Sequence, residues 1–368
     1  MRNNSELGII NKIKKNGKSI VLIIVIIIAV FFLNKAITAF NNSNNKSPIL
    51  PEGWKIIRPP HEVSAIVRQG DIIWAGGVNG VFKVRRKEAV LDKKLESDFP
   101  IAYVKAMTVD KNNVLWIGHE GGLAKYDGKT LINLTTEDGL LDNRVNALTT
   151  DKNGDVWVGT WKGAFKMSLG KINPGKWSIL SVENGLKDDM VNAILCDTKG
   201  GVWFGSYVAP QGGISYLKDN KWYYFSTENG LPHNNINAFW EDNNGVWSAT
   251  GFSNQGGACA FTNLEGKPAI SKIMNKSDGL AGNKVRSVYQ DNSQRLWFGS
   301  EYDGIAVLND HKINVYTTKD GLSDNEVKCM LQDNDGNMWL GTRDGITYIS
   351  NETRGRLPET LGRGRNGQ

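Results

Sequence analysis

The sequence has little of the chemistry from which catalytic and metal sites are usually built. Its 368 residues include three cysteines and four histidines. Cys196, Cys259 and Cys329 form no C-x-x-C pair, so neither a zinc site nor a disulfide framework is indicated. The sequence contains no nucleophile elbow and no phosphate-binding loop. We therefore expect no metal and no other cofactor, and we favour a binding protein over an enzyme.

A concentrated excess of one charge is missing from the central part of the chain. The net charge of the whole chain is +6. Residues 1–50 carry a net charge of +6 and residues 351–368 a net charge of +2, which leaves −2 for residues 51–350. Because nucleic acid binding needs a concentrated basic face, we expect no nucleic acid partner.

Long apolar runs are absent except at the beginning of the chain. The basic head at 1–18 precedes an unbroken run of 14 apolar residues from Ile20 to Leu33. A helix over 19–40 is then either an uncleaved signal anchor, with the basic head in the cytoplasm, or a signal peptide. We favour the membrane anchor because the basic head is long for a signal peptide. Either alternative places the rest of the chain outside the cytoplasm, with 41–52 as a polar linker.

Glycine and tryptophan, in contrast, recur throughout the chain. Short apolar stretches centred on tryptophan occur seven times, at Trp74, Trp116, Trp157, Trp203, Trp247, Trp297 and Trp339. The intervals are 42, 41, 46, 44, 50 and 42 residues, which is typical of the four-stranded blades of a β-propeller. Helical repeats of similar period are the alternative. The apolar runs last only five to eight residues between Gly, Asn and Asp clusters, which favours strands.

One repeat divides into four expected strands, A to D. Strand A follows a D-G-L or N-G-L turn whose glycine is expected to have a positive φ, at Gly139, Gly185, Gly230, Gly279 and Gly321. An aspartate ends strand A and opens a hairpin turn by accepting hydrogen bonds from nearby amides. Strand B carries the tryptophan, which we expect to pack between neighbouring blades. Strands C and D complete the blade.

The last repeat lacks a strand D, and the beginning of the chain supplies a candidate. Trp54 to Arg58 resembles the outer strands KWSIL and KWYYF of other repeats. We therefore predict an all-β fold: a seven-bladed β-propeller over 53–350, with its last blade closed by this N-terminal strand and preceded by one transmembrane helix. The glycine- and arginine-rich tail at 351–368 is expected to be disordered.

The pattern D-G-L, N-x-V, D-x-x-G and W-x-G-T-x-x-G resembles the two-component regulator propeller repeat. That family occurs as paired propellers in the extracytoplasmic sensor halves of hybrid two-component kinases, many of which respond to polysaccharide fragments, and in stand-alone proteins. The resemblance covers residues 51 to 350 and implies a sensor-like propeller. No second propeller, kinase or DNA-binding segment is expected in this sequence, so the signalling output of the family does not carry over.

When the seven repeats are aligned, the residues at one equivalent position form a column. One such column is expected to surround the axis of the propeller. The residue after the apolar position that opens strand A is Ser64, Lys105, Asn146, Asn192, Asn237, Arg286 or Lys328. This ring of amides and cations contains no carboxylate. It either hydrates a water-filled channel or binds an anionic or hydroxyl-rich ligand such as a uronic-acid sugar.

A second column places aromatic side chains on the B-to-C turns of four adjacent blades. They are Trp161, Tyr207, Phe252 and Tyr302. In this strand order the D-to-A and B-to-C turns emerge on the same face, so an aromatic rim is expected beside the amide ring. The alternative is that Tyr207 and Phe252 pack against their own long loops.

These patterns favour a membrane-tethered recognition module for a carbohydrate or a protein partner. A polysaccharide lyase or hydrolase is the second hypothesis, since His61, His119 and His233 lie in turns of this same face, with His119 and His233 as the candidate bases. A pure assembly scaffold is the third.

Overall fold

The computed structural model describes residues 50–207, 211–264 and 267–354. The predicted cytoplasmic head, the helix at 19–40, residues 41–49 of the linker and residues 355–368 of the tail lie outside the described residues. Over the described ranges, no helix has both the length and the apolar character needed to span a bilayer.

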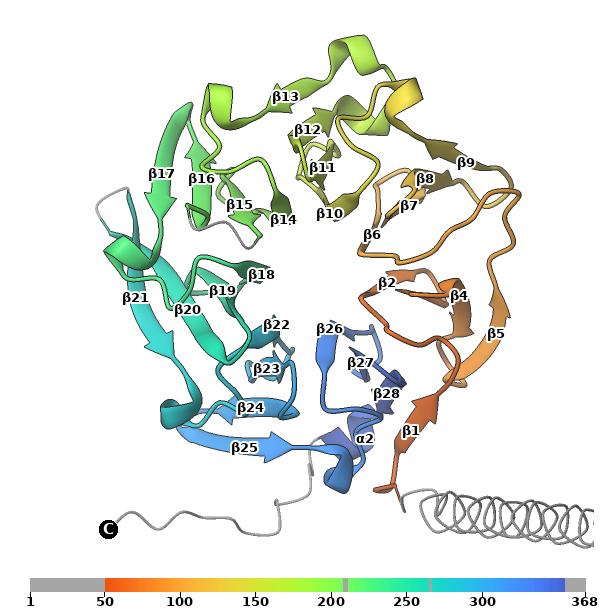
Figure 1. Ribbon diagram of the computed structural model, residues 1–368. Coiled ribbons are helices and arrows are strands. Elements are labelled where there is room, and N and C mark those ends of the chain that lie inside the picture. The colour runs from red at the N-terminus through yellow and green to blue at the C-terminus, as the bar shows by residue number, and fades with distance from the viewer. Residues whose placement is uncertain (1–49, 208–210, 265–266, 355–368) are drawn as a thin grey trace, which may run out of the picture. The chain divides into compact units, whose positions relative to one another are not determined.

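Seven four-stranded antiparallel sheets surround a central axis, as the sequence predicts (Figure 1). In each sheet the first strand listed below is the innermost one, and the blades follow one another around the ring. The first three blades are β2 (Ala65–Gln69), β3 (Ile72–Gly77), β4 (Gly80–Arg85) and β5 (Val90–Lys94); β6 (Ala106–Val109), β7 (Leu115–His119), β8 (Gly122–Tyr126) and β9 (Leu131–Leu134); and β10 (Val145–Thr150), β11 (Val156–Thr160), β12 (Gly163–Met167) and β13 (Ser178–Leu180).

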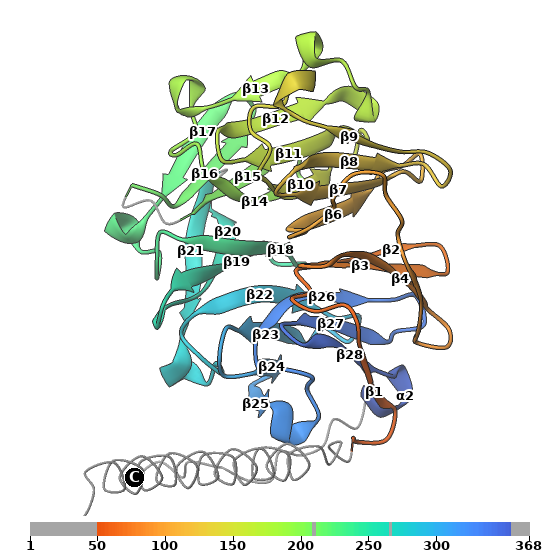
Figure 2. The same cartoon turned by 45° about the vertical axis from the view of Figure 1, so that its right-hand side comes forward.

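The remaining blades repeat this order, and the turned view shows them as separate twisted sheets (Figure 2). They are β14 (Val191–Cys196), β15 (Val202–Ser206), β16 (Ile214–Lys218) and β17 (Lys221–Phe225); β18 (Ile236–Glu241), β19 (Val246–Phe252), β20 (Gln255–Leu264) and β21 (Lys267–Met274); β22 (Val285–Gln290), β23 (Leu296–Ser300), β24 (Ile305–Asn309) and β25 (Lys312–Tyr316); and β26 (Val327–Gln332), β27 (Met338–Thr342), β28 (Gly345–Ile349) and β1 (Trp54–Ile57).

The beginning of the chain closes the last blade, as predicted. Strand β1 pairs antiparallel with β28 in the register Trp54↔Ile349 to Ile57↔Ile346. Trp54 is buried in a cluster with Trp297, Tyr316 and Leu340, which belong to the last two blades. The two ends of the described strands are therefore joined by backbone hydrogen bonds and by shared apolar burial.

The repeated tryptophans pack between blades. All seven are buried, and each contributes to an apolar cluster that contains side chains of the following blade. Trp116, for example, packs with Val156 and Phe165 of the third blade. The glycine two positions after it belongs to the same contact, because a Cβ at Gly118 would lie 2.7 Å from Cγ1 of Val145 in the next inner strand. The W-x-G motif thus allows neighbouring blades to approach closely.

The aspartate that ends strand A binds the tryptophan of the same blade. One carboxylate oxygen accepts hydrogen bonds from turn amides, as predicted, while the other accepts one from the indole Nε1. Six blades share this contact, at Asp110–Trp116 (2.9 Å), Asp151–Trp157 (3.1 Å), Asp197–Trp203 (3.0 Å), Asp242–Trp247 (2.9 Å), Asp291–Trp297 (2.9 Å) and Asp333–Trp339 (3.0 Å). In the first blade Gln69 accepts the indole hydrogen bond instead, at 2.8 Å. The aspartate therefore holds the hairpin turn and the tryptophan side chain in a fixed position relative to each other.

The D-to-A connections contain a short 3₁₀ turn that the sequence analysis did not foresee. In the turn at Thr136–Asp138 a capping box joins Thr135 to Asp138, and Gly139 follows with φ +97°. The predicted positive φ is also confirmed at Gly185, Gly230, Gly279 and Gly321. The T-x-x-D and S-x-x-N patterns before the glycines are the signal for this turn.

The predicted disorder of 351–368 is wrong for its first residues. Asn351–Arg354 form the short helix α2. It begins where the backbone N–H of Asn351 donates to Oδ1 of Asn337 at 2.9 Å, so a side chain of the last hairpin turn holds its first residue. Glycine and arginine content alone did not reveal this contact.

Candidate functional site

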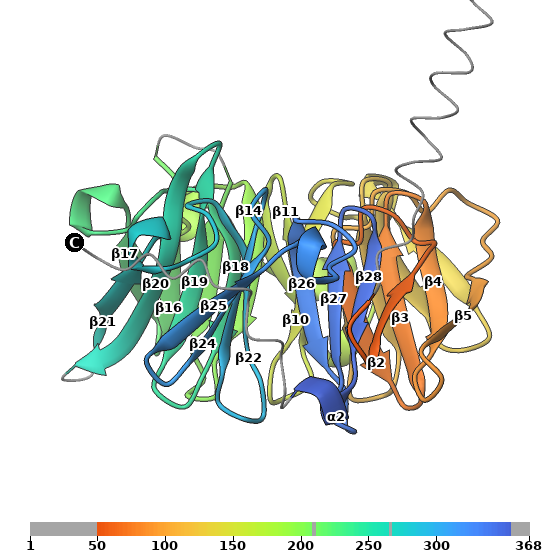
Figure 3. The same cartoon turned by 90° about the horizontal axis from the view of Figure 1, so that it is seen from below.

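The D-to-A connections and the B-to-C turns lie together on one face, which we call the D–A face. Viewed edge-on, the strands run between this face and the opposite one, where the A-to-B and C-to-D turns lie (Figure 3). Backbone hydrogen bonds join the two kinds of turn, for example from Tyr207 N to Met190 O (3.0 Å) and from Arg343 N to Glu326 O (3.2 Å). The face is therefore a continuous hydrogen-bonded surface.

The predicted ring of asparagines links neighbouring blades. The side-chain amides of Asn146, Asn192 and Asn237 donate to the carbonyls that open the next inner strand, at 3.5, 2.7 and 2.7 Å. These N–H groups thus hold blades together. Oδ1 of Asn237 is buried and has no hydrogen-bond partner in the part of the chain that the structure describes, so it remains available as an acceptor.

The cations of the predicted ring are paired with carboxylates, which corrects the expectation of a ring free of negative charge. Lys105 Nζ lies 3.6 Å from Glu120, and Arg286 Nε lies 3.2 Å from Glu301. Lys328 contacts Glu62 and also lies 3.4 Å from Glu326. These glutamates occupy neighbouring columns of the repeat, and Glu62 comes from the opposite end of the propeller sequence. The prediction considered one column only, so it did not include these glutamates.

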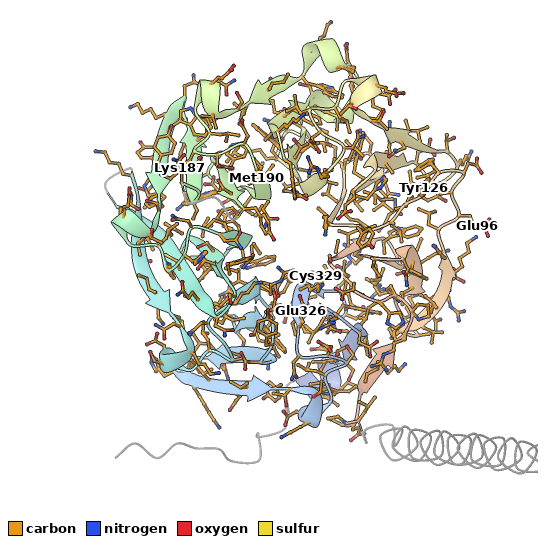
Figure 4. The ribbon with its side chains drawn as sticks, in the orientation of Figure 1. Glu96, Tyr126, Lys187, Met190, Glu326 and Cys329 are labelled. Atoms are coloured by element: carbon orange, nitrogen blue, oxygen red, sulfur yellow. The ribbon has the colours of Figure 1, made fainter. Side chains whose placement is uncertain are left out.

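The pKa values of Glu301 and Glu326, which lie beside Arg286 and Lys328, are shifted in opposite directions. Burial acts to raise the pKa of Glu301, but the hydrogen bond from Lys284 and the charge of Arg286 hold that pKa below its usual value. Burial raises the pKa of Glu326 despite the charges of Lys328 and Arg286. Figure 4 shows Glu326 beside the axis of the ring. Cationic and anionic groups thus alternate over blades six, seven and one.

The predicted aromatic column lies on the D–A face with cations beside it. The guanidinium of Arg144 lies 4.0 Å from the ring centroid of Trp161, and Nζ of Lys284 lies 5.6 Å from that of Phe252. Arg144 is held by Asp142, at 2.9 Å from Nε to Oδ1. Phe252 and Tyr302 are 45% and 56% exposed, so large ring surfaces face solvent. Tyr207 is half-buried.

One exposed aromatic residue of this face was missed. Tyr103 is 51% exposed, and its backbone N–H donates to the carbonyl of Val78 in a B-to-C turn at 3.2 Å. It precedes the apolar residue that opens strand A, and sequence reasoning followed only the position after that residue. The missed column consists of Glu62, Tyr103, Arg144, Met190, Asn235, Lys284 and Glu326.

The histidines give little support to catalysis. His119 is 1% exposed; its Nδ1 accepts from Gly121 N (3.2 Å), and its Nε2 lies 3.0 Å from Asn133 Oδ1. Both ring nitrogens are thus occupied, and the ring is closed off from a substrate. His233 Nδ1 accepts from Asn235 N at 2.8 Å. Burial and the charge of Lys284 lower the pKa of His233.

The buried imidazole of His119 makes stability dependent on pH. Burial lowers its pKa in the folded state, so below about pH 6.5 the unfolded chain binds the proton more readily and stability falls. We expect replacement of His119 by Gln to reduce the loss of melting temperature between pH 7.5 and pH 5. The measurement is thermal unfolding of both proteins at several pH values. An unchanged pH dependence would contradict the assignment of a neutral ring.

The fold and the composition of this face define a seven-bladed propeller with a polar and aromatic face, and some of its repeats match a known repeat family. Residues 139–162, 185–208, 279–302 and 321–344 match the family described as the two component regulator propeller. Four of the seven repeats of this chain thus match the family that its sequence resembles. No match appeared in a search of curated proteins.

Solved structures share the fold at low sequence identity. The extracellular domain of a putative hybrid two component system from B. thetaiotaomicron is 20% identical with a TM-score of 0.70, over 84% of this chain and 43% of that chain. The extracellular domain of a putative one component system from the same organism is 17% identical with a TM-score of 0.62, over 81% and 40%. A streptogramin B lyase is 15% identical with a TM-score of 0.61, over 81% and 97%. This chain thus spans less than half the length of the first two, and the likeness concerns the fold alone.

Proposed function

We propose that this protein is a non-enzymatic recognition module that binds a carbohydrate on its D–A face, outside the cytoplasm. The observation that carries the proposal is the row of aromatic side chains on the B-to-C turns of four adjacent blades. Flat rings, two exposed at Phe252 and Tyr302 and two half-buried at Trp161 and Tyr207, suit a ligand with both apolar ring faces and hydroxyl groups. Arg144 and Lys284, which lie against two of the rings, add donors for hydroxyl or carboxylate oxygens.

The charge pattern favours a weakly charged ligand over a strongly anionic one. Glu301, Glu326 and Glu62 already accompany Arg286 and Lys328, so these cations are largely neutralised. A strong anion would have to compete with those carboxylates. Lys105 and Arg144 are exposed but are likewise paired, with Glu120 and Asp142. Neutral sugars do not compete with these carboxylates.

A protein partner is the second candidate. Tyr, Trp and Arg side chains dominate the binding energy of protein interfaces, and the D–A face carries Tyr103 and Tyr302 as well as the Arg144–Trp161 pair. Direct binding measurements distinguish a glycan ligand from a protein partner, because a glycan ligand should bind in the absence of any other protein.

Two observations support an extracytoplasmic location with a membrane tether. The basic head followed by the apolar run from Ile20 to Leu33 is typical of a signal anchor. Extracellular domains of other proteins share the fold. Protease protection of the propeller in sealed membrane vesicles from expressing cells tests this orientation.

The aromatic column should carry most of the binding free energy. Simultaneous replacement of Trp161, Tyr207 and Tyr302 by Ala is expected to weaken glycan binding about 100-fold, because each aromatic anchor contributes roughly 1 kcal/mol or more. The measurement is a glycan array probed with the full chain, followed by titration of the retained glycans.

A matched control removes exposed apolar side chains elsewhere. Replacement of Ile132, Ile179 and Tyr224, which are exposed on outer strands or their ends, should leave glycan binding unchanged. Equal retention of glycans by the wild type and the aromatic triple variant would remove the D–A face as the binding site.

A further inference from the structure

A cavity of about 390 Å³ lies between the fifth and sixth blades, away from the D–A face. Its lining includes Trp247, Asn244 and Lys272 of the fifth blade and Gln290, Gln294 and Asp310 of the sixth. The lining residues of the A-to-B and C-to-D turns place it toward the opposite end of the strands. The two blades are neighbours in the ring, with β18–β21 followed by β22–β25 (Figure 1).

The cavity has a specific origin in the repeat. In every blade one residue of strand C lies directly opposite the tryptophan of strand B, and these residues are Lys83, Lys125, Lys166, Tyr216, Ala260, Val307 and Tyr348. The longer side chains lie against the indole: Lys125 Nζ is 5.4 Å from the Trp116 ring centroid, and the Tyr216 and Trp203 centroids are 4.2 Å apart. Ala260 is the smallest member of the column. In the fifth blade the space beside the tryptophan therefore stays open.

A β-bulge lies at the same position. Ala260 pairs with Lys272, and Phe261 pairs with Ile270, so Ser271 is an extra residue in strand β21. Its Oγ donates to the carbonyl of Ala260 at 3.2 Å and keeps its acceptor capacity. Bulges redirect side chains and are enriched beside functional sites. The extra residue of this bulge, Ser271, lines the cavity.

The wall contributed by the sixth blade is fixed by hydrogen bonds between turns. Asn243 Nδ2 donates to Gln294 Oε1 at 3.0 Å, which joins the A-to-B turns of the two blades. Gln290 Nε2 lies 3.4 Å from the carbonyl of Gln294. The amide groups that line the cavity are thus positioned before any ligand arrives, which reduces the entropy lost on binding.

The lining favours a neutral ligand with many hydroxyl groups. Lys272 and Asp310 have opposite charges, and neither forms an ion pair with any residue in the described ranges. The carboxylate of Asp242 already accepts hydrogen bonds from Asn244 N, Gly245 N and Trp247 Nε1. Amide, hydroxyl and ammonium groups around an indole wall offer both donors and acceptors to vicinal hydroxyls.

We propose that this cavity, the blade 5–6 pocket, is a second binding site that takes one neutral sugar unit, either a free monosaccharide or the end of a longer glycan. It is independent of the D–A face, because none of its lining residues belongs to that face. A glycan that reaches both sites would be held more tightly than by either site alone.

The pocket is tested by filling it. Ala260→Tyr introduces the side chain that the fourth and seventh blades carry at the same register position, and it should occupy the cavity beside Trp247. The full chain is titrated with glucose, galactose, mannose and N-acetylglucosamine, and with oligosaccharides that end in the sugar bound best. Binding is followed by calorimetry and saturation-transfer NMR. We expect one of these sugars to bind the wild type, and Ala260→Tyr to weaken that binding at least tenfold.

Two further variants separate loss of the site from loss of the fold. Lys125→Tyr makes the same residue at the same register position of the second blade, and it should leave sugar binding unchanged. Gln294→Ala removes one amide without adding volume and should weaken binding several-fold even if Ala260→Tyr folds poorly. Binding of none of the four sugars, or binding that both pocket variants leave unchanged, overturns the proposal. Oligosaccharide binding that is lost only in the aromatic triple variant would place the ligand on the D–A face alone.

Discussion

Replacement of Trp54 by alanine is expected to lower the free energy of unfolding by about 3–5 kcal/mol, the usual cost of truncating a buried tryptophan. Trp54 belongs to the strand that closes the ring, and it packs with Trp297, Tyr316 and Leu340. Loss of its ring removes apolar burial in the blade that combines the first described strand with the last three. The measurement is urea unfolding of the full chain, followed by tryptophan fluorescence.

A conservative variant tests the cause of that loss. Nε1 of Trp54 is buried without a hydrogen-bond partner among the described residues, so its polarity contributes no contact there. Trp54→Phe keeps most of the apolar volume and removes the unpaired donor, and we expect it to cost less than about 1.5 kcal/mol. Faster hydrogen exchange confined to β26, β27 and β28 in Trp54→Ala would locate the defect in the closing blade. A loss below 1 kcal/mol for Trp54→Ala would contradict closure by β1.

Replacement of Arg86 by alanine is expected to be comparably destabilising, by about 3–5 kcal/mol. The Arg86 side chain is 7% exposed and joins the first blade to the last one. Its Nη2 lies 2.8 Å from Asp71, and its Nη1 contacts Asp335 and lies 4.0 Å from the fully buried Asp333. Without the guanidinium, the carboxylate of Asp333 keeps its hydrogen bonds but loses its nearest cation. Equilibrium unfolding at constant salt concentration measures the loss.

An exposed ion pair beside the closing strand of the last blade is the control. Arg58 Nη2 lies 2.7 Å from Asp344, and both side chains are exposed. Exposed pairs contribute about 0–1 kcal/mol, so Arg58→Ala should cost far less than Arg86→Ala. Similar losses for the two variants would show that the buried pair is not a specific stabiliser of the closure.

The fold was predictable because its determinants repeat within short segments. The tryptophan, the aspartate five or six residues before it in six blades, and the glycine two residues after it in six blades all act inside one blade or against the next one. Closure was predictable for a related reason: Trp54 and its neighbours resemble an outer strand that is missing from the last repeat. Seven copies of one pattern make such an omission visible in a single sequence.

The candidate site was less predictable because its contacts cross the repeat. Lys328 meets Glu62, which is 266 residues away, and no column of the repeat places the two together. His119 turns inward because Asn133 offers a partner on the outer strand of its own blade. Tyr103 follows a connection that lacks the D-G-L turn, so it stood outside the aligned pattern. Contacts between side chains that are distant in the sequence could therefore be identified only from the structure.

The positions that break the repeat are the ones that create the blade 5–6 pocket. Ala260 replaces a larger side chain, and Ser271 adds a residue to an outer strand, whereas the surrounding tryptophan and aspartate keep the common pattern. Departures of this kind open a cavity between two blades while the tryptophan keeps its contacts with the next blade. A propeller can in this way acquire a site on the flank of one blade in addition to a site on its D–A face.

Product analysis of a retained glycan distinguishes recognition of the glycan from its cleavage. The full chain is incubated with each glycan that it retains on the array, and the mixture is analysed by mass spectrometry. We predict that the glycan is recovered intact from the wild type and that the aromatic triple variant does not retain it. Shortened products with new reducing or unsaturated ends would contradict this prediction and identify the protein as a hydrolase or a lyase.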